Sequence, residues 1–543
     1  MSRMVAMSQP SHLHVVDWAI IGVYACSTLA LGWYYGRKQR DTDEYFVGHG
    51  GIHPFFIGVS LFATLLSTVS YLSAPGEAVG KGPVGLFGWV ILPLIYVVVA
   101  YGLLPIYMKQ RVTSAYELLE VRLGLSVRLL GATMFLALRL VWMTLLVYLA
   151  AKAMTIALGV DAKWVPLVVL ITGVVSVIYT TMGGLRAVVI TDFMQALLLL
   201  GGAWLVIAII TWEFGGFDWF PRQWQSNWDR QPIFSFDPET RITLVGTIVS
   251  MTVWFIATAG GDQTSVQRFM ATRDLKAARR AYAVQLSVTV VVLATLFLVG
   301  FALLGYYQVR ADELPANVDL GAHADQVFPH FIGTQLPVGI AGLVVAAMFA
   351  AAMSSIDSGV NSVTAVVMTD FLDRFGLKPR TETGHVRIAR ALALAIGLVV
   401  VLGSSSVKLI EGNITAVTNK TVNLLVTPIF ILFALALFVR RATALGAWVA
   451  TICGVTTAVL IAFSGPIVTA LATGWDVDPA WFGVELITET DAATGLTKVR
   501  APDPVSFQWI GLTTLIVGLT TGILVSHVDR RLRRVAKAEE TRS

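Results

Sequence analysis

The sequence predicts an all-α polytopic membrane protein that crosses the bilayer about thirteen times. Only 13% of the 543 residues are charged and 56% are hydrophobic, whereas soluble domains carry about 25% charged residues. Apolar stretches of roughly 20 residues recur between Trp18 and Val525, and each is long enough to cross a hydrocarbon core of about 30 Å as a helix. The lipid bilayer is therefore the expected surrounding of this chain, and a soluble enzyme does not fit its composition.

The individual spans follow from the apolar runs and from the polar loops between them. The first run is followed at once by Arg37 and Lys38 and has no small-residue cleavage site, so a retained helix is predicted instead of a signal peptide. The expected spans cover residues 17–36, 55–75, 84–107, 129–157, 164–182, 188–213, 243–262, 281–308, 337–368, 388–407, 417–439, 444–464 and 506–527.

Basic residues gather in alternate loops, as cytoplasmic loops do. The clusters are Arg37, Lys38 and Arg40; Lys109, Arg111, Arg122 and Arg128; Arg268, Arg273, Lys276, Arg279 and Arg280; Arg374, Lys378, Arg380, Arg387 and Arg390; and Arg440 and Arg441 with the tail from Arg530 to Arg542. Placing them all on one side requires an odd number of crossings. The N-terminus is therefore predicted outside and the C-terminus in the cytoplasm, in the inner membrane. The basic tail is then a topology signal, and no nucleic-acid partner is predicted.

The order of the spans predicts an inverted repeat. When the first span is set aside, spans two to six and seven to eleven form two groups of five with opposite topology. The expected parts are an extra helix and loop (1–54), a first repeat (55–213), an outer loop with the second repeat (214–439), and two C-terminal helices with an outer loop and a basic tail (440–543). Each group opens with a span that contains helix breakers, Ala74-Pro75-Gly76 in the first and Gly260-Gly261 in the second. Such paired broken helices indicate a midplane binding site in a secondary transporter; the alternative is that the breakers only end their spans.

The span at 337–368 carries the densest run of polar residues within the predicted membrane region. Ser354, Ser355, Asp357 and Ser358 follow one another closely, and hydroxyl and carbonyl oxygens suit a hard cation such as sodium. Serines alone can equally serve helix packing. Asp357 favours function, because an ionisable group inside a span is costly. Asp192 begins its span at the cytoplasmic end, where a solvated carboxylate is the alternative to a role in the site.

Two cations and one further carboxylate lie within or near spans. Arg139 is too deep to reach either surface easily and needs an anion, either Asp357 or another buried carboxylate, or else the carboxylate of a substrate, which its bidentate fork suits. Lys420 is close enough to a span end to snorkel to the interface. Glu77 follows the first breakers and is expected to cap the helix or face a vestibule, with Lys81 near enough to neutralise it. The histidines show no ligand spacing, so no metal except sodium is predicted.

Four segments, in order, resemble the signature of the sodium:solute symporter family, which includes sodium/glucose, proline, monocarboxylate and iodide symporters. They are residues 43–46 (DEYF), 183–195 (GGLRAVVITDFMQ), 266–271 (VQRFMA) and 354–362 (SSIDSGVNS). The resemblance implies a leucine-transporter-type core of two inverted five-helix repeats. It also implies a sodium site made by the carbonyls of Ala63, Leu66 and Ala351 and by the side chains of Ser354 and Ser355.

The resemblance further implies a second cation at Asp192, Ser354, Asp357 and Ser358, as in some members. An aspartate stands at 357 where the two-sodium pattern has serine. Three possibilities stay open: Asp357 binds the second ion more strongly, binds a proton, or pairs with Arg139. For the substrate, the first core helix lacks the amide and carboxylate groups of sugar-transporting members, and residues 73–78 (SAPGEA) are similar to the monocarboxylate, iodide and vitamin branch. The residues expected to bind substrate are Ser67, Ser70, Tyr71, Arg139, Thr258 and Lys420.

Together these features predict a secondary transporter, not an enzyme, which couples sodium influx to uptake of a small organic anion by alternating access. A monocarboxylate is the favoured substrate, sodium is the ion required, and the chain is expected to be a monomer or a weak oligomer. A sodium-coupled carrier of a neutral solute, such as a sugar, amino acid or polyol, is the first alternative. A sensor built on a transporter fold is the second.

Overall fold

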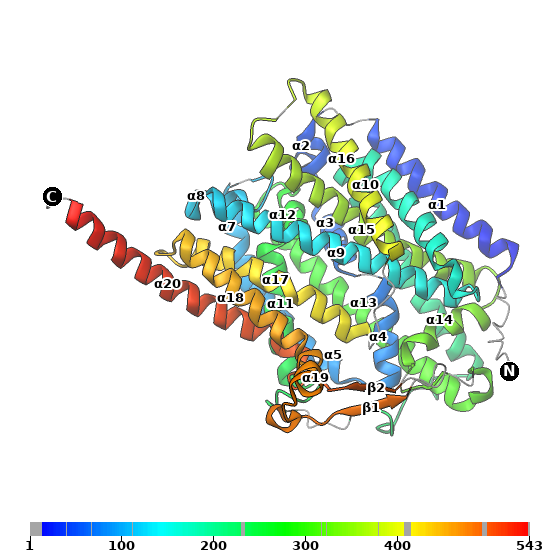
Figure 1. Ribbon diagram of the computed structural model, residues 1–543. Helices are drawn as coiled ribbons and strands as arrows, with labels where there is room; N and C mark the ends of the chain where they lie inside the picture. Colours follow the sequence, from blue (N-terminus) through cyan, green and yellow to red (C-terminus); the bar gives the residue numbers. More distant parts are fainter. Residues whose placement is uncertain are drawn as a thin grey trace.

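The computed structural model describes residues 13–37, 39, 41–66, 68–110, 112–229, 234–315, 318–321, 323–377, 379–406, 414–490 and 497–540. These residues are almost entirely helical (Figure 1). The helices of the first half are α1 (Val15–Gly36), α2 (Thr42–Val47), α3 (Pro54–Leu65), α4 (Thr68–Gly80), α5 (Val84–Phe87), α6 (Leu92–Val97), α7 (Leu104–Gln110), α8 (Glu117–Leu123), α9 (Leu125–Ala157) and α10 (Val165–Glu213). Those of the second half are α11 (Leu244–Gly261), α12 (Gln263–Met270), α13 (Leu275–Val309), α14 (Ala324–Thr334), α15 (Ile340–Val366), α16 (Glu382–Ser406), α17 (Ile414–Phe438), α18 (Ala444–Ala462), α19 (Ser464–Trp475) and α20 (Ile510–Glu540).

Eleven helices of the described residues are long and apolar enough to span a membrane, or twelve when the bent pair of α3 and α4 counts as one span. One of the eleven, α10, has 49 residues. At 1.5 Å per residue it would be about 74 Å long if straight, more than twice the hydrocarbon thickness. It therefore holds two spans, as the sequence predicted for residues 164–182 and 188–213, and the count agrees with about thirteen.

The chain folds back on itself within α10 at Gly184. This residue has a left-handed φ of 59°, which glycine adopts without strain. The Nε2 atom of Gln195 lies 3.3 Å from the hydroxyl of Tyr179, sixteen residues earlier. Those residues would be about 24 Å apart along a straight helix. The turn at Gly184 thus brings two halves of α10 side by side and creates a polar interface between them.

The first broken helix differs from the sequence prediction in the position of its break. Helix α3 ends at Leu65, Leu66 is extended with φ −86° and ψ 117°, and α4 leaves at an angle of 70°. The predicted break at Ala74-Pro75-Gly76 is wrong, because these residues lie inside α4. Proline removes only one backbone donor, and packed neighbouring helices tolerate it within a membrane. The true break lies where the hydroxyl of Thr68 donates to the carbonyl of Met348 in α15, at 2.9 Å.

The second broken helix has its break where the sequence placed it. Helix α11 ends at Gly261, Asp262 is extended with φ −92° and ψ 118°, and α12 begins at Gln263. Hydroxyls from two tyrosines satisfy the freed carbonyls: Tyr107 donates to Gly260 and Tyr116 to Gly261. The prediction from Gly260-Gly261 is confirmed, and both breaks lie in the buried part of the bundle.

The bundle has a buried centre and an apolar outer surface. Helix α15 packs on α10, α1 and α9 and runs through the middle of the bundle in Figure 1, whereas α1 and α20 lie at opposite edges. Peripheral side chains such as Val23 and Leu402 are about 70% and 68% exposed, as expected for positions that face lipid. The strands β1 (Ile487–Thr490) and β2 (Thr497–Arg500) form an antiparallel hairpin in the segment before α20.

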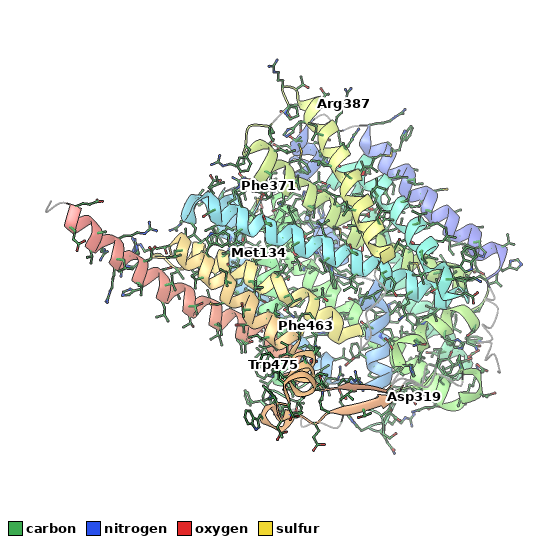
Figure 2. The ribbon with its side chains drawn as sticks, viewed as in Figure 1. Met134, Asp319, Phe371, Arg387, Phe463 and Trp475 are labelled. Atoms are coloured by element: carbon green, nitrogen blue, oxygen red, sulfur yellow. The ribbon has the colours of Figure 1, made fainter. Side chains whose placement is uncertain are left out.

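Figure 2 labels residues at the two ends of the bundle. Trp475 and Asp319 lie at the end that carries the hairpin, and Arg387 lies at the opposite end. The first two belong to loops predicted outside, and Arg387 belongs to a basic loop predicted in the cytoplasm. These representatives of the two groups of loops therefore lie at opposite ends of the molecule, and the direction of the chain in the membrane stays a prediction.

Candidate functional site

The first helix break meets α15 at the predicted sodium ligands. The hydroxyl of Ser354 lies 3.0 Å from the carbonyl oxygens of both Ala63 and Ala351, and the residue at the break, Leu66, is 4% exposed. The hydroxyl of Ser355 is buried and has no hydrogen-bond partner. Ser354 contacts a carbonyl at the helix break, and the neighbouring Ser355 has an unpartnered oxygen; carbonyl and hydroxyl oxygens of this kind suit a sodium ion. The donor set therefore fits the ion that the sequence implied.

The residues around this site also bear on which kind of ion it could hold. Within the described ranges, no three His, Cys, Asp or Glu residues come together as metal ligands. A site of neutral carbonyls and hydroxyls suits a monovalent ion, because divalent ions are usually held by several carboxylates.

Two residues of the predicted second cation site already bind a positive group. The Arg268 guanidinium lies 3.4 Å from the carboxylate of Asp192 and 2.5 Å from the hydroxyl of Ser358. Ser60 completes the cluster, since its hydroxyl donates to Asp192 at 2.5 Å and accepts from Arg268 at 2.8 Å. The sequence had placed Arg268 in a basic cytoplasmic loop, which is wrong: it is 1% exposed within α12. Asp192 is likewise buried, not solvated.

Asp357, the third expected ligand, faces a different set of groups. One of its carboxylate oxygens accepts from Ser176 at 2.5 Å and from Thr180 at 2.6 Å, both on the first half of α10. The other oxygen is buried and unpartnered. No ion pair reaches Asp357 within the described part of the chain, so, of the alternatives left open by the sequence, the pairing of Asp357 with Arg139 is not formed. A buried carboxylate without a compensating charge is costly, so either a bound cation or a proton must neutralise Asp357.

Arg139 pairs with Asp262, the residue at the second helix break. Asp262 also accepts from the backbone of Thr264 at 2.8 Å, which fixes its carboxylate at the start of α12. Arg139 and Asp262 line a small chamber of about 40 Å³ together with Thr258. Both the Nε of Arg139 and the hydroxyl of Thr258 are buried there without partners. Two hydrogen-bond donors among the lining residues are therefore unused: the Nε–H of the Arg139 guanidinium, whose charge Asp262 neutralises, and the hydroxyl of Thr258.

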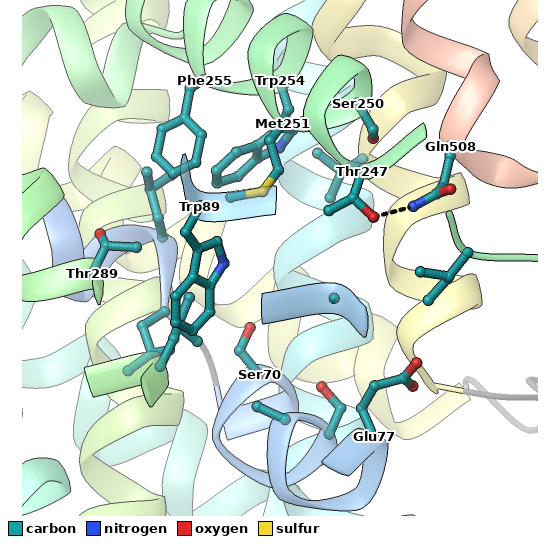
Figure 3. Close-up of a pocket in the computed structure, with 18 of the residues that line it drawn as sticks. Ser70, Glu77, Trp89, Thr247, Ser250, Met251, Trp254, Phe255, Thr289 and Gln508 are labelled. Atoms are coloured by element: carbon teal, nitrogen blue, oxygen red, sulfur yellow. Dashed lines mark hydrogen bonds between the residues drawn. The ribbon is translucent and has the colours of Figure 1, made fainter. Parts of the chain in front are cut away.

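A larger cavity of about 330 Å³ adjoins this chamber (Figure 3). The two share Leu65, Trp142, Trp254 and Val422 as lining residues. Polar groups line the larger cavity among aromatic side chains, and Figure 3 labels Ser70, Glu77, Trp89, Thr247, Ser250, Met251, Trp254, Phe255, Thr289 and Gln508. A mostly apolar pocket of this volume with a few convergent polar groups is typical of a small-molecule site.

Glu77 is held at this cavity by a residue that the sequence did not suggest. Arg241 pairs with Glu77 and, at 2.9 Å, with Asp229. The expectation that Lys81 neutralises Glu77 is therefore wrong, and the vestibule position of Glu77 is correct. Arg241 lies 164 residues from Glu77, so sequence proximity could not identify the pair.

The remaining predicted substrate residues lie in three different places. Ser70 lines the larger cavity. Tyr71 lines neither of the two cavities and packs against Phe328, with ring centroids 5.6 Å apart. Lys420 forms an ion pair with Asp503 and lines neither cavity. Ser67 lies outside the described residues. Trp142, Trp254 and the other aromatic lining residues were missed, because separate helices supply them and no local pattern marks them.

Two broken helices that meet at a polar centre, with the larger cavity beside the first break and the small chamber at the second, are typical of a secondary active transporter. The profile of the sodium:solute symporter family matches residues 45–454, and the chain belongs to this family. The fold is all-α and of the leucine-transporter type, the protein is a multi-pass membrane transporter and not an enzyme, and it couples the movement of a solute to sodium.

Similar proteins of known role agree with this assignment. The chain is 31% identical to the sodium/sialic acid symporter of Proteus mirabilis, over 79% of this chain and 86% of that protein. It is 24% identical to the sodium-coupled monocarboxylate transporter 1 of Xenopus laevis, over 97% and 87%. A solved structure of a substrate-bound, outward-open Na⁺-coupled sialic acid symporter superposes with a TM-score of 0.74 and 26% identity, covering 94% of this chain and 98% of that one.

Proposed function

We propose that this protein uses the sodium gradient to take up an organic acid, and that the carboxylate of the acid binds in the chamber of Arg139 and Thr258. The observation that carries this proposal is the pair of buried, unpartnered donors in that chamber. A carboxylate accepts several hydrogen bonds and binds charged donors strongly. Similar proteins are named for sialic acid and monocarboxylates, which are acids, and this supports the same class of cargo.

The ion pair of Arg139 with Asp262 affects how strongly the substrate carboxylate is bound. An unpaired guanidinium in the membrane interior would be unstable in the empty transporter, and Asp262 removes that cost. A substrate carboxylate then meets the Nε–H of Arg139 and the hydroxyl of Thr258 without displacing Asp262. The binding is weaker than for a free cation, which suits a substrate that must also be released.

Coupling is proposed to act through α15. Sodium bound by the carbonyls of Ala63, Leu66 and Ala351 and the hydroxyls of Ser354 and Ser355 would hold the break of α3 and α4 against α15. Leu65 and Leu66, at the same break, line the larger cavity. Sodium thereby stabilises the cavity wall, and by linkage the substrate strengthens sodium binding by the same factor. A second cation is proposed at Asp357, Ser176 and Thr180, because Arg268 already neutralises Asp192.

The same proposal includes an inner-membrane location with the N-terminus outside and a cytoplasmic C-terminus. The position of Arg387, in a basic loop at the end opposite the hairpin, supports it, since basic loops stay in the cytoplasm. In this orientation the larger cavity is reached from the outer side, and sodium leaves into the cytoplasm.

A neutral solute is the second candidate, and a specific observation favours it. Among the described lining residues of the larger cavity, Glu77 is the charged one, and Asp262 compensates Arg139. A sugar or polyol would then bind through hydroxyls without meeting a net positive charge.

Uptake into proteoliposomes separates these candidates. Labelled acetate, pyruvate, lactate, propionate and longer acids are compared with labelled sugars and amino acids, with and without an inward sodium gradient. We expect sodium-dependent accumulation of an acid that Arg139→Gln reduces at least tenfold, because a charged hydrogen bond contributes about 1.5–3 kcal/mol. Arg222→Gln is the matched control, since Arg222 is exposed and pairs only with its neighbour Asp218. Sodium-driven uptake of neutral solutes alone, unchanged in Arg139→Gln, would contradict the proposal.

A further inference from the structure

The wall of the larger cavity includes residues from outside the two predicted repeats. Phe507 and Gln508 lie in the short turn just before α20 (Phe507–Trp509) and line the cavity beside Thr247 of α11. In Figure 3 Gln508 points toward Thr247, and a dashed line joins the two side chains. The C-terminal part of the chain thus contributes directly to the solute cavity.

The amide of Gln508 is fixed in one orientation. Its Nε2 donates to the hydroxyl of Thr247 at 2.7 Å, and its Oε1 accepts from the backbone N–H of Thr243 at 3.1 Å. The hydroxyl of Thr247 in turn donates to the carbonyl of Thr243 at 2.7 Å. These bonds determine which atom of the amide is nitrogen, and they leave one N–H and one lone pair of Gln508 without a partner in these hydrogen bonds.

The surrounding backbone is built to let Gln508 reach this position. A Cβ at Gly246 would collide with the Oε1 of Gln508, so glycine is needed there for the close approach. The turn is anchored by Ser506, whose N–H donates to the carbonyl of Pro238 at 2.7 Å and whose hydroxyl donates to the carbonyl of Arg241 at 2.6 Å. Gln508 itself is 4% exposed, so its amide is preorganised within the wall.

The distance between this wall and the carboxylate chamber sets the length of a substrate that can contact both. Thr247 and Thr258 both lie on α11 and are eleven residues apart, which is about 16 Å along the helix. Hydrogen bonds of about 3 Å at each end leave about 10 Å for the ligand between its two polar ends. A two- to four-carbon acid cannot bridge this distance, and a chain of about eight carbons can.

We infer that Gln508 is a specificity-determining residue for elongated organic acids that carry a neutral hydrogen-bonding group, such as a hydroxyl or an amide, about 10 Å from the carboxylate. This inference rests on the proposed function, because it requires a carboxylate at Arg139. It assigns the distal end of the substrate to Gln508 and Thr247. It also explains why the cavity exceeds the volume that a short monocarboxylate needs.

Matched ligands test the inference on the purified full chain in sodium. Calorimetric titration compares 8-hydroxyoctanoate with octanoate, and 4-hydroxybutyrate with butyrate. We expect the distal hydroxyl to tighten binding about tenfold in the long pair and to have no effect in the short pair. Gln508→Leu should abolish the difference in the long pair by weakening only 8-hydroxyoctanoate.

Two further variants distinguish a loss of binding from a loss of folding. Thr247→Val removes the hydroxyl that orients the amide and should also reduce the long-pair ratio. Thr473→Ala is the control on the same C-terminal segment, because its hydroxyl bonds only within α19 and does not line the cavity. Sodium-dependent thermal stabilisation identifies variants that remain folded.

The outcomes separate the inference from the proposed function. A long-pair ratio near one in the wild type, or a ratio that Gln508→Leu and Thr247→Val leave unchanged, overturns the role of Gln508 while the acid assignment stands. Binding of 1,8-octanediol as tight as 8-hydroxyoctanoate, unaffected by Arg139→Gln, overturns the acid assignment instead.

Discussion

Replacing Ser355 by alanine tests the sodium site at the first helix break. Ser355 is 5% exposed, and its hydroxyl has no hydrogen-bond partner in the structure. In the absence of sodium its removal should leave stability unchanged or raise it slightly, because an unsatisfied buried polar group is unfavourable by about 1–3 kcal/mol. In sodium the same change removes an oxygen ligand of the ion.

The magnitude follows from the strength of one charged contact. A hydrogen bond to a charged group contributes about 1.5–3 kcal/mol, and an ion–oxygen contact of similar strength corresponds to a 10- to 150-fold loss of sodium affinity. At a sodium concentration about 100 times the dissociation constant, sodium stabilises the wild type by about 2.7 kcal/mol. A 30-fold weaker site reduces that stabilisation to about 1 kcal/mol.

Ser354→Ala is the matched comparison. Ser354 shares its hydroxyl between the carbonyls of Ala63 and Ala351, both at 3.0 Å, so its loss should destabilise the protein by about 1 kcal/mol even without sodium. The two variants therefore differ in sodium-free buffer and resemble each other in sodium.

The assay is thermal unfolding of the purified protein across a sodium titration, with potassium replacing sodium to hold ionic strength constant. We expect the midpoint of sodium stabilisation in Ser355→Ala to move to at least tenfold higher concentration. An unchanged midpoint, with a normal sodium-free melting temperature, would refute the assignment of Ser355 as a ligand.

Two other predictions address residues that the structure placed in new surroundings. Asp357→Asn keeps the hydrogen bonds from Ser176 and Thr180 but removes the uncompensated charge, so the number of sodium ions carried per substrate should fall by one; an unchanged ratio in flux measurements would show that no second cation binds there. At the predicted cytoplasmic end, hydrogen bonds from Arg374 lower the pKa of Glu120 below its ordinary value of 4.5. A carboxylate with a depressed pKa stabilises the folded state above its unfolded pKa, and this contribution is lost as the pH falls through the folded pKa. Arg374→Gln should therefore lower the melting temperature modestly at pH 7, and the difference from the wild type should vanish as the pH falls below 4.5; a difference that persists in acid would contradict this origin.

The spans could be predicted because membrane burial is a local requirement. Each segment must satisfy its own backbone hydrogen bonds within lipid, so about 20 apolar residues suffice to identify a helix. The turn at Gly184 was found in this way, as a short polar gap between two apolar runs. The break after Gly261 was also found from sequence, since adjacent glycines weaken a helix wherever they occur.

The first break was misplaced because local breaker chemistry does not decide it. Pro75 and Gly76 lie within α4, while the chain bends nearer Leu66, where α15 packs against it. Tertiary contacts, such as the hydrogen bond from Thr68 to Met348, determine which weak point of a helix opens. The sodium ligands Ala63 and Leu66 came from family resemblance and stay a prediction, supported by their position at the true break.

The sequence alone identified the bilayer as the surrounding of the chain, the spans and the family, and it singled out Arg139 and Asp357 as ionisable residues inside the membrane. The tertiary structure decided the partners of the buried polar residues: Arg139 with Asp262 and not Asp357, Arg268 with Asp192, and Gln508 with Thr247. The physical reason is that hydrophobicity acts on each segment separately, whereas a buried charge is stabilised only by groups that folding brings within a few ångströms. Those partners lie 76 to 261 residues apart in the chain, a separation at which no local pattern connects them.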